Sequence, residues 1–282
     1  MKWNAYWRLM RFDKPIGILL LWFPTAWALW FANKGLPPLR LLLLFLCGTV
    51  LMRAAGCVIN DIADRNIDKH VTRTKLRPLT SGEVDLREAL VLLFSLLVSA
   101  LFVLTQLPWD CFNLGFIALF ISFLYPFCKR FLDAPQFILG LAFSMGIPMA
   151  YVASGVSLNG ECLLLFLINF AWILVYDTMY AMTDKADDLR IGVKSTAIYF
   201  ASYDRLIIGF LQCTLHGLWL FWALMNHANL WFYSFWFVAG TILIYQQKLI
   251  NKREPTDCFK AFKISVYYGA FMWFALSVCN WP

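Results

Sequence analysis

The feature that most constrains this chain is a series of nine apolar segments, each close to the roughly 20 residues that a membrane-spanning helix needs. They cover residues 16–33, 41–59, 88–106, 111–128, 135–154, 161–180, 205–226, 229–247 and 260–280. Only 15% of the 282 residues are charged, whereas a soluble domain carries about 25%. We therefore predict an all-α membrane protein in which nine transmembrane helices form one integral-membrane domain over residues 1–282.

The positive charges indicate how this arrangement lies in a membrane. If the N-terminus is cytoplasmic, only Lys34 and Arg40 of the 24 lysines and arginines fall on the opposite side, and Arg53 falls inside a predicted span. Cytoplasmic loops of membrane proteins carry an excess of Lys and Arg. We therefore predict a cytoplasmic N-terminus and a periplasmic C-terminus. Two long polar loops, near 60–87 and 181–204, then cap the cytoplasmic face.

Several other classes of protein are disfavoured. The net charge of +7 comes from short basic clusters between apolar segments, so no basic domain for nucleic acid is expected. The eight cysteines form no C-x-x-C pair and predict neither a metal site nor a disulfide framework. The chain also lacks the G-x-S-x-G elbow of hydrolases and the Walker phosphate loop.

Acidic residues cluster directly after two of the predicted spans. Asn60, Asp64 and Asp68 are spaced four residues apart after the second span, so on a continued helix they would share one face. Asp184 and Asp188 have the same spacing after the sixth span. Both sets are expected at the cytoplasmic rim of the membrane.

Two carboxylate faces at one depth repel each other unless a cation lies between them. Oxygen ligands completed by water and phosphate suit Mg²⁺. Basic residues accompany both acidic sets: Arg65, Lys69, Arg73, Lys75, Lys129, Arg130 and Lys194. The pattern therefore predicts a diphosphate held between Mg²⁺ and Lys or Arg. The ordinary alternative is that these are solvated loop charges paired with one another.

Arg53 stands apart from these clusters. It lies seven residues before Asn60, about 10 Å deeper in the membrane at 1.5 Å per helical residue. A charge at that depth is costly and usually functional, and an arginine can bind a carboxylate through two parallel hydrogen bonds. A snorkelling or internally paired arginine is the alternative.

Two segments resemble known signatures. Residues 60–79, NDIADRNIDKHVTRTKLRPL, resemble the first aspartate signature of the UbiA superfamily of intramembrane prenyltransferases, and residues 176–197, YDTMYAMTDKADDLRIGVKSTA, resemble the second. Residues 8–17 and 125–131 are also similar to the 4-hydroxybenzoate polyprenyltransferase branch, which acts in bacterial ubiquinone biosynthesis. The resemblance covers nearly the whole chain.

This resemblance implies a fold, a reaction and a location. The fold would be nine helices around a lipid-open central cavity in the bacterial inner membrane, with the active site opening to the cytoplasm. The enzyme would transfer a polyprenyl group from a polyprenyl diphosphate to the ring carbon ortho to the hydroxyl of 4-hydroxybenzoate, and release diphosphate. The length of the prenyl chain is left open.

The resemblance also assigns roles to residues. Mg²⁺ would be held by Asn60, Asp64, Asp68, Asp184 and Asp188. The four aspartates among them are the candidate catalytic residues. The diphosphate would contact Arg11, Arg65, Arg73, Lys129 and Lys194, and Arg53 would face the aromatic acid. The ring proton would go either to an aspartate such as Asp188 or to the departing diphosphate.

Two other functions stay open at this point. The acceptor could be another aromatic compound, such as a naphthoate, homogentisate or haem. Alternatively, the aspartates could serve a membrane cation transporter, but such a protein is expected to carry acidic residues near the bilayer midplane of several helices. Here the aspartates gather at one rim beside basic residues, which favours a diphosphate. No obligate protein partner and no nucleic acid are expected.

Overall fold

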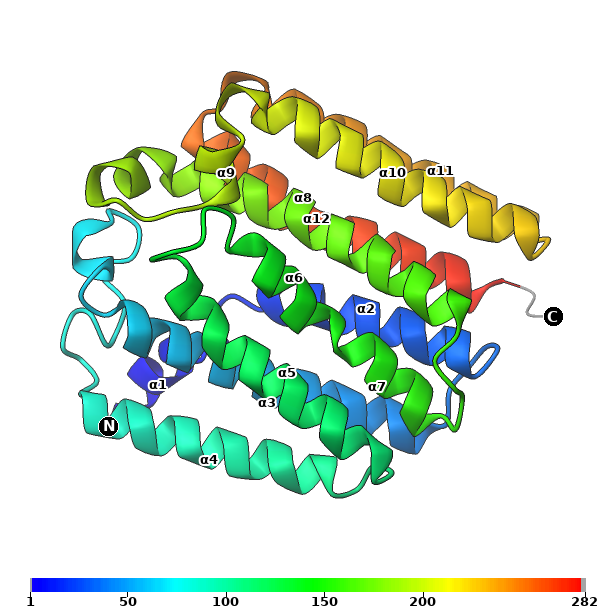
Figure 1. Ribbon diagram of the computed structural model, residues 1–282, viewed down its shortest axis with the longest axis horizontal. Coiled ribbons are helices and arrows are strands. Elements are labelled where there is room, and N and C mark those ends of the chain that lie inside the picture. The colour runs from blue at the N-terminus through cyan, green and yellow to red at the C-terminus, as the bar shows by residue number, and fades with distance from the viewer. Residues whose placement is uncertain (1, 280–282) are drawn as a thin grey trace.

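The computed structural model describes residues 2–279, and every regular element within them is a helix (Figure 1). The α-helices are α1 (Trp3–Leu9), α2 (Ile16–Ala32), α3 (Leu39–Asp64), α4 (Leu86–Leu104), α5 (Asp110–Cys128), α6 (Gln136–Ser144), α7 (Gly146–Ala153), α8 (Gly160–Ile191), α9 (Thr196–Tyr199), α10 (Asp204–Met225), α11 (Leu230–Leu249) and α12 (Pro255–Ser277). Short 3₁₀ turns are η1 (Asp68–His70), η2 (Ala201–Tyr203) and η3 (Ile250–Lys252). The predicted all-α class is confirmed.

Several helical segments are long and apolar enough to cross a membrane, as a multi-span protein requires. Six such segments occur among the described residues: Leu39–Asp64, Leu86–Leu104, Asp110–Cys128, Gln136–Ala153, Gly160–Ile191 and Ala201–Met225. Helix α2 is apolar but shorter, with 17 residues, and α11 and α12 cover the last two predicted spans. The number of nine spans and the orientation of the termini stay predictions.

One predicted span, 135–154, is broken in its middle. It divides into α6 and α7 at Met145. A Cβ atom at Gly146 would lie 2.3 Å from Oγ1 of Thr25 on α2, so only glycine fits at this close approach. Pro148 follows and has no backbone N–H to continue the helical hydrogen bonds. The break lets α2 approach closely.

Aromatic packing holds the larger of two apolar cores, which joins α2 to α8, α10 and α12. Trp27 of α2 packs against Trp172 at 5.2 Å and against Trp219 at 5.3 Å between ring centroids. Its indole Nε1 donates a hydrogen bond to the carbonyl oxygen of Gly269 on α12. A smaller core joins α1, the second half of α3, and α4 through Leu9, Val58 and Leu93.

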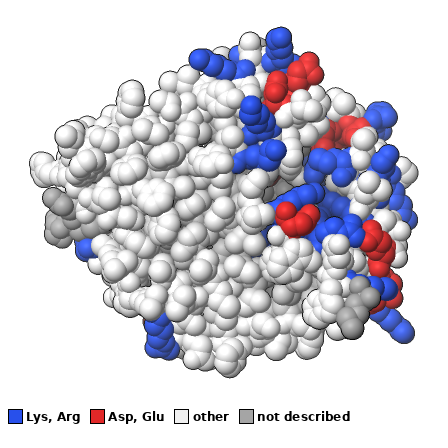
Figure 2. All heavy atoms as spheres, turned by 180° about the vertical axis from the view of Figure 1, so that it is seen from behind, with Lys and Arg blue, Asp and Glu red and all other residues white. Residues whose placement is uncertain are grey.

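Charged side chains gather at one end of this helical body. Figure 2 shows Lys, Arg, Asp and Glu around a hollow at that end, while most of the remaining visible face carries neither charge. The C-terminal ends of α3 and α8 both lie at this end (Figure 1). The fold therefore brings two segments that are more than 100 residues apart in the chain to the same place.

Candidate active site

The hollow at the charged end leads into a cavity of about 1280 Å³. Its mouth is lined by polar, acidic and basic side chains, including Asn60, Asp64 and Lys129. Its deeper wall is mostly apolar but includes the charged Arg53 and Asp177. Asp68, Asp184 and Asp188 line the same cavity. The two predicted acidic sets therefore meet at one cavity, as a shared substrate requires.

The loop between α3 and α4 ties the two acidic helix ends together. Arg73 Nε donates to Oδ1 of Asp184 at 3.0 Å, and its guanidinium lies 4.6 Å from the ring centroid of Tyr180. The backbone N–H of Thr72 donates to Oδ2 of Asp187 at 3.0 Å. These contacts between the loop and α8 keep the second acidic set close to the first.

Asp68 departs from the predicted helix face. Helix α3 ends at Asp64, and Asp68 lies on the 3₁₀ turn η1. The prediction that Asn60, Asp64 and Asp68 share one helix face is therefore wrong for Asp68. On this turn Oδ2 of Asp68 accepts a hydrogen bond from Arg77 at 2.7 Å, which fixes the position of its carboxylate. Burial and the carboxylates of Asp61 and Asp64 raise the pKa of Asp68, against the opposing effect of Arg77.

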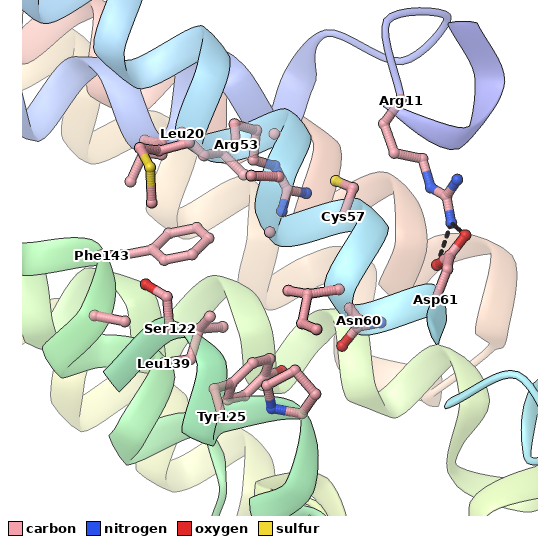
Figure 3. A pocket seen from close by; sticks show the side chains of 18 of the residues that line it. Arg11, Leu20, Arg53, Cys57, Asn60, Asp61, Ser122, Tyr125, Leu139 and Phe143 are labelled. Carbon is pink, nitrogen blue, oxygen red and sulfur yellow. Dashed lines mark hydrogen bonds and ion pairs between the residues drawn. The ribbon is translucent and has the colours of Figure 1, made fainter. Parts of the chain in front are cut away.

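Asp61 joins three segments through buried ion pairs. Both of its carboxylate oxygens accept hydrogen bonds from Arg11 at 2.8 Å (Figure 3), and Oδ1 also accepts from Arg77 at 3.0 Å. Only 1% of the residue surface of Asp61 is exposed. Arg11, a predicted diphosphate contact, lines the cavity, but its guanidinium is engaged by Asp61. Arg77 was not predicted as a site residue.

Lys129 connects α5 to the first acidic set. Its Nζ donates to Oδ1 of Asn60 at 3.3 Å and to Oδ2 of Asp64 at 3.0 Å. Lys129 is a predicted diphosphate contact, and it binds two predicted metal ligands. Arg73, another predicted diphosphate contact, likewise binds the predicted metal ligand Asp184. If Mg²⁺ took the carboxylates, these two basic groups would be released for an anion.

The last two predicted diphosphate contacts differ from each other. Lys194 lines the cavity, but its Nζ forms an ion pair at 2.7 Å with Asp133, an exposed residue outside the lining. Arg65 is exposed, lies outside the cavity lining, and donates to the carbonyl oxygen of Ile62. The structure does not bring Arg65 to the site, because the chain turns after Asp64 and points this side chain outward.

The carboxylates fit Mg²⁺ as ligands supplied from two sides. Oδ1 of Asp64 is buried and has no hydrogen-bond partner, which is costly unless a further group binds there. Within residues 2–279, no three His, Cys, Asp or Glu side chains are close enough to hold an ion by themselves. Mg²⁺ commonly takes only one or two carboxylates and completes its shell with substrate phosphates and water.

Arg53 lies deeper in the same cavity, between α2 and α6 (Figure 3). A Cβ atom on Gly17 of α2 would lie 2.4 Å from its Nη2, and its guanidinium carbon lies 5.8 Å from the ring centroid of Phe143. Its Nε is buried without a hydrogen-bond partner, and it forms no ion pair within the described part of the chain. Arg53 is therefore not held in a direct ion pair, although the carboxylate of Asp177 is near enough to interact with its charge.

Asp177 is a cavity residue that the sequence reasoning missed. It lies on α8 two helical turns below Asp184 and lines the cavity. Gln136 accepts a hydrogen bond from the backbone N–H of Thr196 through Oε1, so its amide nitrogen is left for its hydrogen bond with Asp177. The sequence holds a signal for Asp177, because it precedes Asp184 by seven residues, just as Arg53 precedes Asn60 by seven residues.

Fold and site together define a multi-span membrane protein with an apolar cavity and a mouth lined by acidic and basic groups. The chain belongs to the UbiA prenyltransferase family, whose family model matches residues 21–275. It is 66% identical over 276 residues to a protein of Legionella pneumophila (strain Corby) named 4-hydroxybenzoate octaprenyltransferase, with 98% of each chain covered.

Two solved structures show the same fold. A UbiA homolog from Aeropyrum pernix K1, in its apo form, has a TM-score of 0.78 at 22% identity and covers 90% of this chain and 96% of its own. A UbiA homolog from Archaeoglobus fulgidus bound to GPP and Mg²⁺ has a TM-score of 0.72 at 20% identity and covers 97% of this chain and all of its own, 100%.

Proposed function

We propose that this chain transfers a polyprenyl group from a polyprenyl diphosphate to the ring carbon ortho to the hydroxyl of 4-hydroxybenzoate, a step of ubiquinone biosynthesis. The observation that carries the proposal is the cavity itself, in which acidic and basic groups line the mouth and an apolar wall lies behind them. The name of the Legionella relative and the ligands of the Archaeoglobus homolog agree with this reaction.

The proposed topology follows from the charge distribution. All 282 residues form one domain of nine spans in a bacterial inner membrane, with a cytoplasmic N-terminus and a periplasmic C-terminus. The charged mouth of the cavity then opens to the cytoplasm, where the loops near 60–87 and 181–204 cap it. The excess of Lys and Arg at this end supports that orientation.

The donor diphosphate is held at the mouth. Asn60, Asp64, Asp68, Asp184 and Asp188 would hold Mg²⁺, which when bound neutralises charge that develops on the leaving diphosphate. Arg73, Lys129 and Lys194 line the mouth and are positioned to take the phosphate oxygens. Arg11, which is engaged by Asp61, completes the basic side of the mouth.

The acceptor lies below the donor head. Arg53 binds the carboxylate of 4-hydroxybenzoate, and Phe143 lies beside the guanidinium. The donor C–O bond breaks with its electron pair on the diphosphate, and the ring carbon ortho to the hydroxyl forms the new C–C bond. The buried cavity protects the allylic cation from water.

The ring must then lose one proton to restore its aromatic character. Asp188 and the departing diphosphate are the two acceptors considered from the sequence. Asp177 is a third, because it lies on the cavity wall deeper than Asp184.

A reconstituted assay tests the proposal. Purified protein in liposomes is incubated with Mg²⁺, a panel of prenyl diphosphates and 4-hydroxybenzoate, and products are identified by mass spectrometry. Prenylated 4-hydroxybenzoate is the expected product, and its formation should stop when Mg²⁺ is chelated. If a product forms only with a naphthoate, homogentisate or haem, that compound is the acceptor in place of 4-hydroxybenzoate. Metal flux in the absence of any diphosphate would indicate a transporter instead.

A further inference from the structure

Asp204 is a buried carboxylate that the proposed reaction does not use. It begins α10, is 0% exposed and lies outside the cavity lining. Its Oδ1 accepts hydrogen bonds from Nε and Nη2 of Arg253 at 3.0 and 2.7 Å, and its Oδ2 accepts one from Nζ of Lys185 at 3.3 Å. A buried charge is stable only when it is paired. We call Asp204, Lys185 and Arg253 the Asp204 node.

The node also binds the backbone that leads into α10. Nζ of Lys185 donates to the carbonyl oxygen of Ala201 at 3.1 Å, and Nη2 of Arg253 donates to that of Ser202 at 2.8 Å. Ala201 and Arg253 have φ values of 50° and 56°, in the left-handed region that residues with a Cβ rarely adopt. Such a conformation persists only where the surrounding structure holds it. The node therefore joins α8 firmly to the start of α10 and to the turn before α12.

The last turns of α8 have little apolar packing of their own. After Met182, no described residue of α8 is buried. Residues 183–191, which we call the α8 extension, carry Asp184 and Asp188, and both of these line the cavity. A helix end without buried apolar contacts opens readily. Polar contacts to neighbouring segments must therefore hold the α8 extension in place.

These polar contacts flank the side of the helix that faces the cavity. At about 100° per residue around the helix axis, Asp188 lies about 40° from Asp184, Lys185 about 100° from it, and Asp187 about 60° from it in the opposite direction. The backbone N–H of Thr72 binds Asp187 on one side, and the node binds Lys185 on the other. The two cavity-lining carboxylates lie between these attachments, which together fix the rotation of the α8 extension.

We propose that the Asp204 node positions Asp184 and Asp188, the proposed metal ligands of α8, by fixing the rotation of the α8 extension through Lys185. The inference rests on the proposed function. Lys185 and Asp204 both lie outside the cavity lining, so they are positioning residues that act through the carboxylates of α8. Their role matters because a misplacement of about 1 Å can lower a rate about 100-fold.

The direction of the effect separates position from charge. Lys185 places a positive charge beside the proposed metal site, and like charges repel. Removing that charge should by itself strengthen Mg²⁺ binding. Loss of the attachment should instead weaken it, since the carboxylates are no longer held towards the mouth. Weaker binding after removal of Lys185 is therefore an effect of position.

Lys185→Met tests the proposal, because methionine keeps an unbranched stem and the helix propensity of lysine but cannot bind Asp204. We expect the Mg²⁺ concentration for half-maximal turnover to rise at least about tenfold, as is typical when a partner outside the ligand shell is lost. The KM for 4-hydroxybenzoate should stay unchanged. In the absence of metal and substrate, amide hydrogen exchange over residues 183–191, measured by mass spectrometry, should become faster.

Two further variants frame this result. Lys185→Arg restores a cation for Asp204 and should restore both the Mg²⁺ requirement and the slow exchange. Lys2→Met is the matched control, because Lys2 also pairs with a carboxylate, that of Glu88 on α4, and lies outside the cavity lining. It should change neither quantity. If Lys185→Met does not purify, Lys185→Gln serves in its place, with the same expected directions.

The outcomes separate the positioning role from the reaction. If the unaltered protein prenylates 4-hydroxybenzoate but Lys185→Met needs no more Mg²⁺ than before, the node is only structural and the proposal is overturned while the reaction stands. A higher Mg²⁺ requirement without faster exchange over residues 183–191 would also overturn it. If the unaltered protein uses no donor, the reaction is wrong and the node is judged by exchange alone. Faster exchange in Lys185→Met and not in Lys2→Met would then support the attachment, and equal exchange would reject it.

Discussion

The two acidic helix ends both present carboxylates to the mouth of the cavity, but their backbones differ. At the end of α8, Asp184 and Asp188 both lie on one continuous helix that runs to Ile191. At the end of α3, the helix stops at Asp64, and Asp68 lies on a separate 3₁₀ turn. Helix geometry sets the spacing of Asp184 and Asp188, and Arg73 of the α3–α4 loop also binds Asp184. The position of Asp68 depends on the loop that follows α3.

Different interactions stabilise the two ends. Arg11 and Arg77, from segments before and after α3, bind Asp61, and Arg77 also binds Asp68. By contrast, α8 ends in a glycine cap at Gly192, and next to its aspartates Lys185 pairs with the buried Asp204. The comparison teaches that the acidic end on α3 depends on several buried ion pairs, whereas the end of α8 combines a continuous capped helix with the loop contacts of Arg73 and Thr72.

The largest expected effect tests what the two ends share. Asp64→Ala and Asp184→Ala should each lower turnover at least about 100-fold, because each removes a proposed Mg²⁺ ligand and with it the charge stabilisation expected at the leaving diphosphate. Membrane assays with labelled 4-hydroxybenzoate measure the rate. Both variants should still insert in the membrane and purify normally.

Asp110→Ala is the control for this pair, since Asp110 is exposed and lies outside the cavity lining. It should retain full activity. Near-normal rates in both site variants would reject a shared metal site. A loss in only one of them would mean that one helix end performs the task alone.

The second expected effect is a difference in unfolding free energy between variants at the end of α3 and variants at the end of α8. Arg77→Ala leaves buried Asp61 and Asp68 without a shared partner, and losing one member of a buried ion pair costs about 3 kcal/mol of unfolding free energy. Arg73→Ala removes a guanidinium that is 31% exposed and bound to Asp184, so it should cost much less. Thermal unfolding in detergent measures both, and equal losses would contradict the ion-pair account of α3.

The third effect concerns the groups that lie seven residues below each acidic end, Arg53 on α3 and Asp177 on α8. Arg53→Ala should raise the KM for 4-hydroxybenzoate about tenfold or more, as expected when a hydrogen bond to a charged group is lost. The KM for the prenyl diphosphate should change little. Asp177→Asn, which keeps the shape, should instead lower kcat if Asp177 takes the ring proton. Equal changes in both KM values for Arg53→Ala would count against carboxylate recognition.

The difference between the two ends also explains what the sequence could predict. Apolar length and four-residue spacing depend only on the local chain, so the helical class and the position of Asp184 and Asp188 on α8 were predictable. The turn that carries Asp68 depends on Arg77 in a loop with no periodicity, and nothing in the sequence distinguishes inward-facing Arg77 from outward-facing Arg65. The break at Met145 was missed for a similar reason, because it depends on the approach of Thr25 from another helix.

The smallest effect tests the backbone device at the end of α8. Gly192 has φ of 72° and ψ of 23°, a left-handed conformation that costs a residue with a Cβ about 1 kcal/mol. We therefore expect Gly192→Ala to lower the free energy of unfolding by about 1 kcal/mol, with a modest decrease in turnover as the end of α8 loosens. Thermal unfolding and the same membrane assay measure the two quantities.

Gly160→Ala provides the control within the same helix. Gly160 begins α8, has no left-handed φ, and an added Cβ would meet no atom within 4 Å. Alanine there should be neutral or slightly stabilising, because it restricts the unfolded chain. If Gly192→Ala were as neutral as Gly160→Ala, the cap would not hold the end of α8. The ion pairs of Lys185 with Asp204 and of Arg73 with Asp184 would then have to position the end of α8, and both acidic ends would depend mainly on long-range ion pairs.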